Sequence, residues 1–366
     1  MGLQCGIVGL PNVGKSTLFN ALTNAKAQAA NFPFCTIEPN IGVITVPDDR
    51  LNTLERLVKP EKVLPTTIEI VDIAGLVQGA SKGEGLGNQF LGNIRETDAI
   101  LHVLRCFDDD NIVHVDGSVD PIRDKETIDV ELQLKDLEAV QKKIEKVSRS
   151  ARTGNKEAQK ELGVLESLKE SLEKSLNVRG LDFTEEERNL FIKPLQLITD
   201  KPVLYVCNVS ESDAVNGNSY VNKVKGSILD ENAEILFLAV SIEADINELD
   251  SVEEREMFLN DIGIKEPGAS KLIRSTYGLL NLQTYFTAGE KEVRAWTIPV
   301  GASAPQAAGI IHTDFEKGFI RAEVISIDDL VNYGSELKVK EAGKIRVEGK
   351  DYILKDGDVL HFRFNV

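Results

Sequence analysis

The residues best suited to chemistry lie in one short stretch near the start of the chain, residues 9–17, with the sequence Gly-Leu-Pro-Asn-Val-Gly-Lys-Ser-Thr. This stretch fits the pattern of a phosphate-binding loop, in which glycines let several backbone N–H groups converge on a phosphate. Lys15 would place a positive charge next to the β- and γ-phosphates, and the Ser16 hydroxyl would bind Mg²⁺. The predicted phosphate-contacting residues are Asn12, Val13, Gly14, Lys15, Ser16 and Thr17.

The segments on either side of this loop are those that a phosphate-binding loop requires. Residues 3–8 are short and largely apolar, as in a buried strand, and residues 17–22 carry apolar side chains at helical spacing. The N-terminus of that helix would favour the negative charge of a phosphate. A strand, a glycine loop and a helix in this order predict a nucleoside triphosphate site and disfavour a chance match to the pattern.

Two later segments supply candidate magnesium ligands and a γ-phosphate contact. Thr36 stands where GTPase-like proteins have a threonine that reaches Mg²⁺; the alternative is a β-branched residue that leads into the strand 41–46. Asp72 ends the apolar strand 67–72 and fits the Walker B role of holding Mg²⁺ through water. Gly75 would offer its N–H to the γ-phosphate. With Ser16, these residues predict Mg²⁺ as a cofactor.

The residue after Gly75 is Leu76, where Ras-like proteins have the glutamine that orients the attacking water. An apolar side chain cannot hydrogen-bond a water molecule, so another residue must take this part. His114 is a candidate, because its polar loop follows the strand 99–106 at the sheet edge where ligands bind; the alternative is a solvated loop histidine. His102, within that strand, is predicted to be packed. The predicted catalytic residues are His114, Lys15 and Gly75.

The base-recognition segment departs from the guanine pattern. After the strand 202–207 the chain reads Asn208, Val209, Ser210, Glu211, where GTPases have Asn-Lys-x-Asp. The extra methylene of Glu211 moves the carboxylate that would accept the guanine N–H groups, and losing such a contact can cost orders of magnitude in discrimination. The Asn208 amide has the donors and the acceptor that adenine requires. The predicted base-binding residues are Asn208, Val209, Glu211 and Ser241.

Two other patterns complete the chain. From Asp129 to Leu176, apolar residues recur every three or four positions around a polar turn, residues 148–155, which predicts a helical hairpin with a coiled-coil seam that either is structural or binds a partner. Beyond residue 280, alternating segments around a helix at 304–311 predict a small α+β module. The predicted fold is α/β, with a mixed sheet and helices on both faces. The predicted domains are the nucleotide-binding domain (1–127 and 200–279), the helical insertion (128–199) and the C-terminal domain (280–366).

Composition and charge limit the possible functions. The chain has 366 residues, 42% hydrophobic and 28% charged, and no apolar run long enough to span a bilayer. The first strand begins almost at Met1 and the four cysteines lack metal-ligand spacing, so we expect a cytoplasmic protein without disulfides. A net charge of −17 argues against wholesale attraction to nucleic acid, so any RNA contact must use a local patch.

These motifs, taken in order, resemble the YchF/Obg-like ATPase family. The resemblance runs from end to end and depends on the phosphate loop, Asn-Phe-Pro-Phe-Cys-Thr at 31–36, Asp-Ile-Ala-Gly-Leu at 72–76, Asn-Val-Ser-Glu at 208–211 and the closing segment 356–364. It implies a cytoplasmic, Mg²⁺-dependent nucleoside-triphosphatase that prefers ATP to GTP and acts as a nucleotide-dependent switch in translation or stress regulation. It also implies that the C-terminal domain is a TGS domain of β-grasp fold.

The resemblance implies partners and ion contacts as well. It implies association with the ribosome, through the large subunit or the 70S particle, with RNA contacts from the TGS or helical domain. We expect a monomer that does not bind a membrane. His114 would compensate for the missing glutamine, and Asn12 would contact K⁺, a second ion to which proteins with this loop often respond. Two alternatives stay open: a GTPase with a degenerate base loop, and a ribosome- or protein-binding adaptor in which nucleotide only holds the fold.

Overall fold

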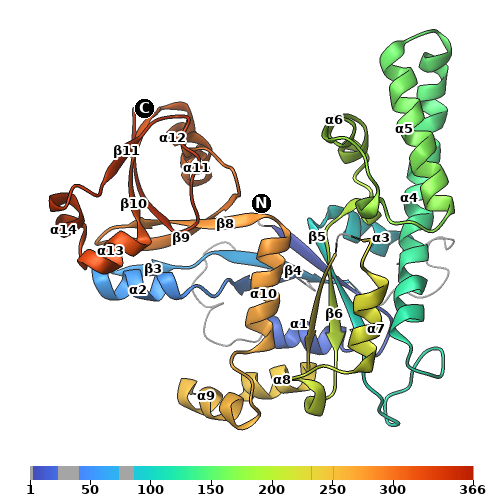
Figure 1. Ribbon diagram of the computed structural model, residues 1–366, viewed down its shortest axis with the longest axis horizontal. Helices are drawn as coiled ribbons and strands as arrows, with labels where there is room; N and C mark the ends of the chain where they lie inside the picture. The colour runs from blue at the N-terminus through green and yellow to red at the C-terminus, as the bar shows by residue number, and fades with distance from the viewer. Residues whose placement is uncertain (1–2, 24–40, 74–85, 232, 250, 366) are drawn as a thin grey trace. The chain divides into compact units, whose positions relative to one another are not determined.

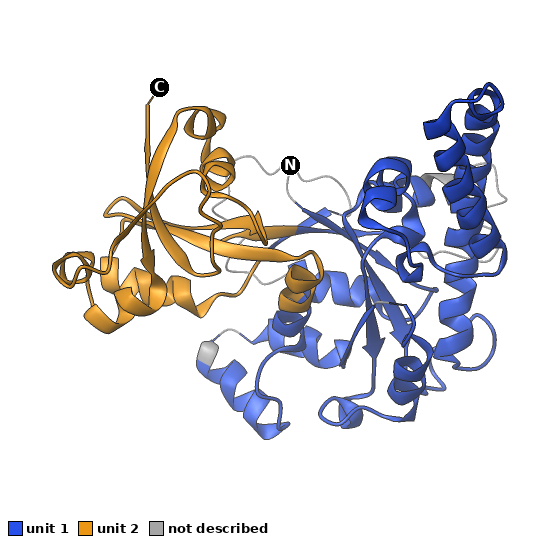
Figure 2. Ribbon diagram, turned by 45° about the horizontal axis from the view of Figure 1, so that its top comes forward, with its two compact units in different colours: residues 1–44, 69–272 blue, residues 45–68, 273–366 orange. Residues whose placement is uncertain are grey.

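The computed structural model describes residues 3–23, 41–73, 86–231, 233–249 and 251–365. The chain forms two compact units (Figure 2): unit 1 comprises residues 1–44 and 69–272, and unit 2 comprises residues 45–68 and 273–366. Residues 45–68 were predicted to belong with the nucleotide-binding domain, whereas in the structure they group with the C-terminal residues. The predicted division into three domains stays a prediction.

Unit 1 is built on a six-stranded sheet with the strand order β2-β4-β1-β5-β6-β7. β1 pairs in parallel with β4 and β5, β5 pairs in parallel with β6, and β6 with β7. Because these strands are parallel, their carboxyl ends meet at one edge, where ligands bind in such sheets. The strands are β1 Gln4–Val8, β2 Ile41–Thr45, β4 Thr67–Asp72, β5 Ala99–Arg105, β6 Val203–Asn208 and β7 Glu234–Leu238.

Helices cover this sheet: α1 packs against α8, and α4 packs against α7 and β5 (Figure 1). The helices of unit 1 are α1 Lys15–Thr23, α3 Leu86–Glu96, α4 Pro121–Arg152, α5 Lys156–Glu173, the short α6 Glu185–Glu187, α7 Ser219–Ser227, α8 Val240–Glu248 and α9 Val252–Asp261. β7 ends at Leu238 and α8 begins at Val240, so Ser241 lies in the first turn of α8. The helix α10 Gly268–Leu279 contains the boundary between the units.

The predicted helical hairpin is present as α4 and α5, but its details differ from the prediction. α4 begins at Pro121, capped by the Asp120 side chain, and continues through Arg152, so the turn is much shorter than residues 148–155. Val140 and Val147 of α4 pack in one core with Leu165 and Leu168 of α5. Three predicted seam residues, Val130, Leu134 and Leu176, are instead 41%, 37% and 47% exposed. The first two precede Leu137, the first residue of α4 in the core that it shares with α5.

Unit 2 is built on a second six-stranded sheet, with the order β11-β10-β12-β8-β9-β3. Its pairs are antiparallel except β12 with β8 and β3 with β9. The strands are β3 Lys62–Leu64, β8 Leu282–Ala288, β9 Glu292–Pro299, β10 Phe319–Ser326, β11 Arg346–Glu348 and β12 Asp358–Phe364. The helices are α2 Asp49–Val58, α11 Ala304–Ile311, α12 Thr313–Lys317, α13 Ile327–Tyr333 and α14 Glu336–Glu341. The helix predicted at 304–311 is confirmed as α11.

Within the described residues, no helix is both long and apolar enough to cross a membrane. Three cysteines, Cys5, Cys106 and Cys207, are buried and have free thiols. Burial raises the pKa of the Cys5 thiol to about 12. The Cys5 thiol is therefore protonated at neutral pH.

Candidate nucleotide-binding site

The phosphate-binding loop joins β1 to α1 and has the backbone that its glycines predict. Gly9 and Gly14 have φ angles of +152° and +102°, and Asn12 has a φ of +62°. A Cβ atom on Gly9 would lie 2.5 Å from the carbonyl oxygen of Val103, and one on Gly14 would lie 2.6 Å from Nδ2 of Asn208. Both positions therefore exclude any side chain.

Lys15, at the start of α1, has a buried ammonium group. The residue is 7% exposed, and its Nζ donates a hydrogen bond to the carbonyl oxygen of Leu10 at 2.6 Å. Burial lowers the pKa of Lys15 to about 8, and the nearby Asp72 carboxylate opposes part of this shift. A buried cation of this kind would be stabilised by the negative charge of a phosphate.

Ser16 and Asp72 lie together, as the predicted metal site requires. The Ser16 hydroxyl donates to Oδ2 of Asp72 at 3.3 Å. The other carboxylate oxygen, Oδ1, is buried and has no hydrogen-bond partner among the described residues. An unpaired buried carboxylate oxygen is costly, and hard oxygen ligands suit Mg²⁺, so the pair fits a bound cation. Thr36 and Gly75 lie outside the described residues.

Asn208, at the end of β6, uses its amide to hold two loops together. Its Nδ2 donates to the carbonyl oxygen of Val13 at 3.0 Å, and its Oδ1 accepts from the N–H of Val240 at 3.1 Å. The side chain thus joins the phosphate loop to the start of α8. Part of its hydrogen-bonding capacity is used inside the protein, and its reading of adenine stays a prediction.

The predicted base-binding residues line a cavity of about 760 Å³ at the carboxyl ends of the strands. Glu211 is exposed at its wall, and Val209 and Ser241 are also part of the lining. Sequence reasoning missed four lining residues, which follow β5: Phe107, Asp108, Asp109 and Ile112. Their position directly after a buried parallel strand is a signal for them, although it predicted only His114.

A buried arginine holds the loop that follows β5. Arg105 is 2% exposed, and its guanidinium donates to the carbonyl oxygens of Phe107, Ile112 and Asp109 at 3.1, 2.9 and 3.1 Å. The same group lies over the Phe107 ring, 4.8 Å from its centroid. One residue therefore fixes the backbone of the loop that carries His114.

His114 is within this loop but does not line the cavity in the described structure. Its side chain is 6% exposed, which contradicts the alternative of a solvated loop histidine. The loop touches the phosphate-binding loop through the preceding residue, since Asn12 Nδ2 donates to the carbonyl oxygen of Val113 at 3.1 Å. His102 is buried in β5, as predicted, and burial lowers its pKa to about 4, so it is neutral.

The sheet order, the phosphate-binding loop and the Ser16–Asp72 pair define a P-loop nucleotide-binding protein with the GTPase fold. Comparison with known proteins agrees. Residues 4–152 match the family model described as 50S ribosome-binding GTPase, and residues 282–365 match the YchF-GTPase_C model, described as a protein of unknown function.

Full-length relatives are similar along the whole chain. The chain is 58% identical to "Ribosome-binding ATPase YchF" of Escherichia coli O157:H7 and 56% identical to that of Bacillus subtilis, with all of each chain covered. A solved structure, "Structure of the Schizosaccharomyces pombe YchF GTPase", matches with a TM-score of 0.89 at 41% identity, covering 99% of this chain and 98% of that one. The chain belongs to the YchF family.

Proposed function

We propose that this protein binds and hydrolyses ATP, with Mg²⁺ as its cofactor, while associated with the ribosome. The observation that carries the proposal is the Ser16–Asp72 pair, with its unpaired Asp72 oxygen, next to the buried ammonium of Lys15. A magnesium nucleoside triphosphate supplies a cation for the oxygen and an anion for the ammonium. Relatives that carry the name ribosome-binding ATPase support both the substrate and the partner.

The proposed roles follow the geometry of the loop. Lys15 and the loop N–H groups bind the β- and γ-phosphates, and Gly75 donates its N–H to the γ-phosphate. Ser16 and Thr36 hold Mg²⁺, with Asp72 behind them through water, and the ion would neutralise charge on the phosphates. His114 positions the water that attacks the γ-phosphorus in line, so that the bond to the β–γ bridging oxygen breaks and ADP leaves. Asn12 is the proposed contact for K⁺.

The preference for adenine rests on the base loop. Glu211 carries its carboxylate one methylene further out than the aspartate that reads guanine, and Val209 replaces the lysine that packs along the base. A GTPase is the second candidate, favoured because the Schizosaccharomyces pombe relative is called a GTPase and because the matched family model is that of a GTPase.

Calorimetric titration of nucleotide-free protein with non-hydrolysable ATP and GTP analogues, with Mg²⁺ and K⁺, separates the two. We expect ATP to bind at least tenfold tighter, about 1.4 kcal/mol. Equal or tighter binding of the GTP analogue would contradict the proposed ATPase and support the GTPase. The Lys15→Ala variant is the control, because it should lose binding of both analogues.

The helical hairpin offers a surface for the ribosome. Residues 142–160, named here the arm tip, contain seven basic and two acidic residues, a net charge of +5 in a chain of net charge −17. Lys142 and Lys143 form ion pairs with Glu138 and Glu161, whereas Lys146, Arg149 and Arg152 are exposed without an ion pair in the described part of the chain. Interaction with the helix dipole would account for the two arginines of the last turn, but not for Lys146. The phosphates of ribosomal RNA fit this patch.

Charge reversal tests the surface. We expect Lys146→Glu, Arg149→Glu and Arg152→Glu together to weaken co-sedimentation with ribosomes and to flatten its dependence on salt. Lys338→Glu, Lys340→Glu and Lys344→Glu together, in unit 2, are a control that makes the same change of about −6 in net charge. If the arm-tip variant binds ribosomes as tightly as wild type, the ribosome-binding surface does not include the arm tip. An adaptor, in contrast, would bind ribosomes equally well with or without nucleotide, and also as Lys15→Ala.

A further inference from the structure

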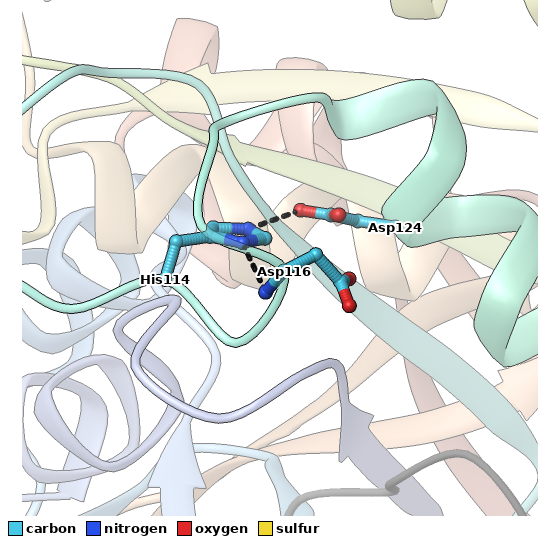
Figure 3. Close-up of side chains that lie close together, drawn as sticks. All are labelled: His114, Asp116 and Asp124. Carbon is cyan, nitrogen blue, oxygen red and sulfur yellow. Dashed lines mark hydrogen bonds and ion pairs between the residues drawn. The ribbon is translucent and has the colours of Figure 1, made fainter.

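His114 has both ring nitrogens bonded inside the protein. Its Nε2 lies 2.8 Å from Oδ2 of Asp124, and its Nδ1 accepts the backbone N–H of Asp116 at 3.1 Å (Figure 3). The tautomer that fits these partners carries its proton on Nε2, because Nδ1 must accept. In this arrangement neither a lone pair nor a proton of the ring is left to orient a water molecule.

Asp124 belongs to the first turn of α4 and is 1% exposed. Its second oxygen, Oδ1, accepts from the guanidinium of Arg123 at 3.2 Å. The contact with His114 is therefore between buried groups, and a hydrogen bond to a carboxylate is stronger than one between neutral groups. Separating the histidine from Asp124 requires that α4 move or that another contact replace this one.

The base of α4 is held by further buried charges. Lys125 pairs with Asp129 at 2.7 Å and with Glu231, and Arg179 pairs with Glu231 at 3.1 Å. Burial would lower the pKa of Lys125, but the Asp129 and Glu231 carboxylates outweigh it and raise that pKa. Further along the helix, Asp136 accepts from the N–H groups of residues 198 and 199. These contacts hold the base of α4 against the segments that carry Arg179, Thr199 and Glu231, so Asp124 leaves His114 only when α4 shifts against them.

The same helix carries the arm tip. α4 has 32 residues, so its axis is about 48 Å long at 1.5 Å per residue. Its first turn bears Asp124, and its last turns bear Lys146, Arg149 and Arg152. Its distal half packs against α5 in a continuous apolar core, which makes the hairpin stiff. A partner bound at the tip thus acts on the helix that holds His114.

We propose that Asp124 is a latch that withholds His114 from the phosphate site, and that a partner bound to the arm tip releases it by shifting α4. The proposal rests on the proposed function, in which His114 positions the attacking water. Asp124 acts through His114 and does not touch the nucleotide, so it is a positioning residue. Turnover is slow while the latch is closed, and release frees the Nε2–H group of His114 to hydrogen-bond the attacking water.

The test compares Asp124→Ala with wild type in ATP turnover, first without ribosomes. Removal of the latch should raise this basal turnover about five- to tenfold and reduce the further stimulation by ribosomes by a similar factor, with unchanged affinity for an ATP analogue. The gain should vanish in Asp124→Ala/His114→Ala. Asp116→Ala is the matched control, because Asp116 is exposed and bonds His114 through its backbone, and we expect wild-type turnover.

The direction in which Asp124→Ala changes basal ATP turnover decides whether Asp124 is a latch. Basal turnover that falls to the level of His114→Ala would mean that Asp124 orients the histidine productively, and unchanged turnover would mean that the contact is structural; either result overturns the latch. If His114→Ala turns over at the wild-type rate with ribosomes present, the proposed role of His114 fails first. Should Asp124→Ala not fold, Asp124→Asn keeps the shape of the side chain and removes its charge. The ¹⁵N chemical shift of His114 Nε2 must then change, because its hydrogen bond is weaker, and turnover must rise.

Discussion

The phosphate-binding loop and the loop after β5 meet at the same sheet edge, yet they are held in different ways. The first, residues 9–16, depends on local backbone conformation: two glycines and Asn12 with positive φ. The second, residues 106–120, depends on distant or buried partners: Arg105 holds its backbone and Asp124 holds His114. The two loops at one sheet edge are thus fixed by different means, the first mainly by residues within it and the second by buried side chains outside it.

The largest expected effect concerns Arg105. Arg105→Met removes the three hydrogen bonds that the buried guanidinium donates to carbonyl oxygens of this loop, and we expect the free energy of unfolding to fall by about 3 kcal/mol. Hydrogen exchange should accelerate in residues 107–117 and stay slow in the phosphate loop. Arg363→Met is the control, since its side chain is 59% exposed and pairs with Glu323 at the surface. Equal acceleration in both loops would contradict the contrast between them.

The next effect concerns two glycines, one in each loop. Gly14→Ala would force a Cβ to within 2.6 Å of Asn208 at a φ of +102°. We expect strain of about 1–3 kcal/mol and a loss of nucleotide affinity of about 10- to 100-fold. Gly117 has a φ of +76° but nothing within 4 Å of its Cβ position, so Gly117→Ala should cost about 1 kcal/mol of stability and leave affinity unchanged. Calorimetry on both variants checks this; equal losses of affinity would refute it.

Lys15 gives the phosphate loop a pH dependence. Its pKa is lowered to about 8 in the folded protein, so its charge is lost as pH rises through 8. Nucleotide affinity should fall by about tenfold for each pH unit above 8, because binding then requires uptake of a proton. Stability without nucleotide should change in the opposite direction between pH 8 and 10.5, since the unfolded chain binds more protons there. Lys15→Arg should show no such fall in affinity; a parallel fall would assign the effect to another group.

The smallest effect concerns the base loop. Glu211 is exposed at the cavity wall, and Glu211→Asp restores the shorter carboxylate of the guanine pattern. We expect the ratio of GTP to ATP affinity to rise by about tenfold. Competition binding with both analogues measures it, with Ser212→Ala as a control in the same wall. An unchanged ratio would mean that Glu211 does not read the base.

Much of the fold was predictable, because its signals are local. Apolar strands before the phosphate loop and before Asp72 and Asn208 were confirmed, as was the helix 304–311. The hairpin was predicted, but its turn was too long and its seam began too early, since Val130 and Leu134 satisfy helical spacing without facing α5. The pairing of β3 with β9 joins residues more than two hundred positions apart, and no local pattern reports such a contact.

The sequence by itself determined the phosphate-binding loop. Its conformation and the start of the following helix depend on about ten neighbouring residues. The positions of Lys15 and Ser16 therefore follow from the local sequence. Only the tertiary structure decided what His114 and Asp124 do. An acidic residue in the first turn of a helix, such as Asp124, already has a local explanation in the helix dipole. The sequence therefore gives no reason to pair it with the histidine. The contact exists because the loop after β5 folds back onto α4, and folding of that kind is fixed by the packed protein.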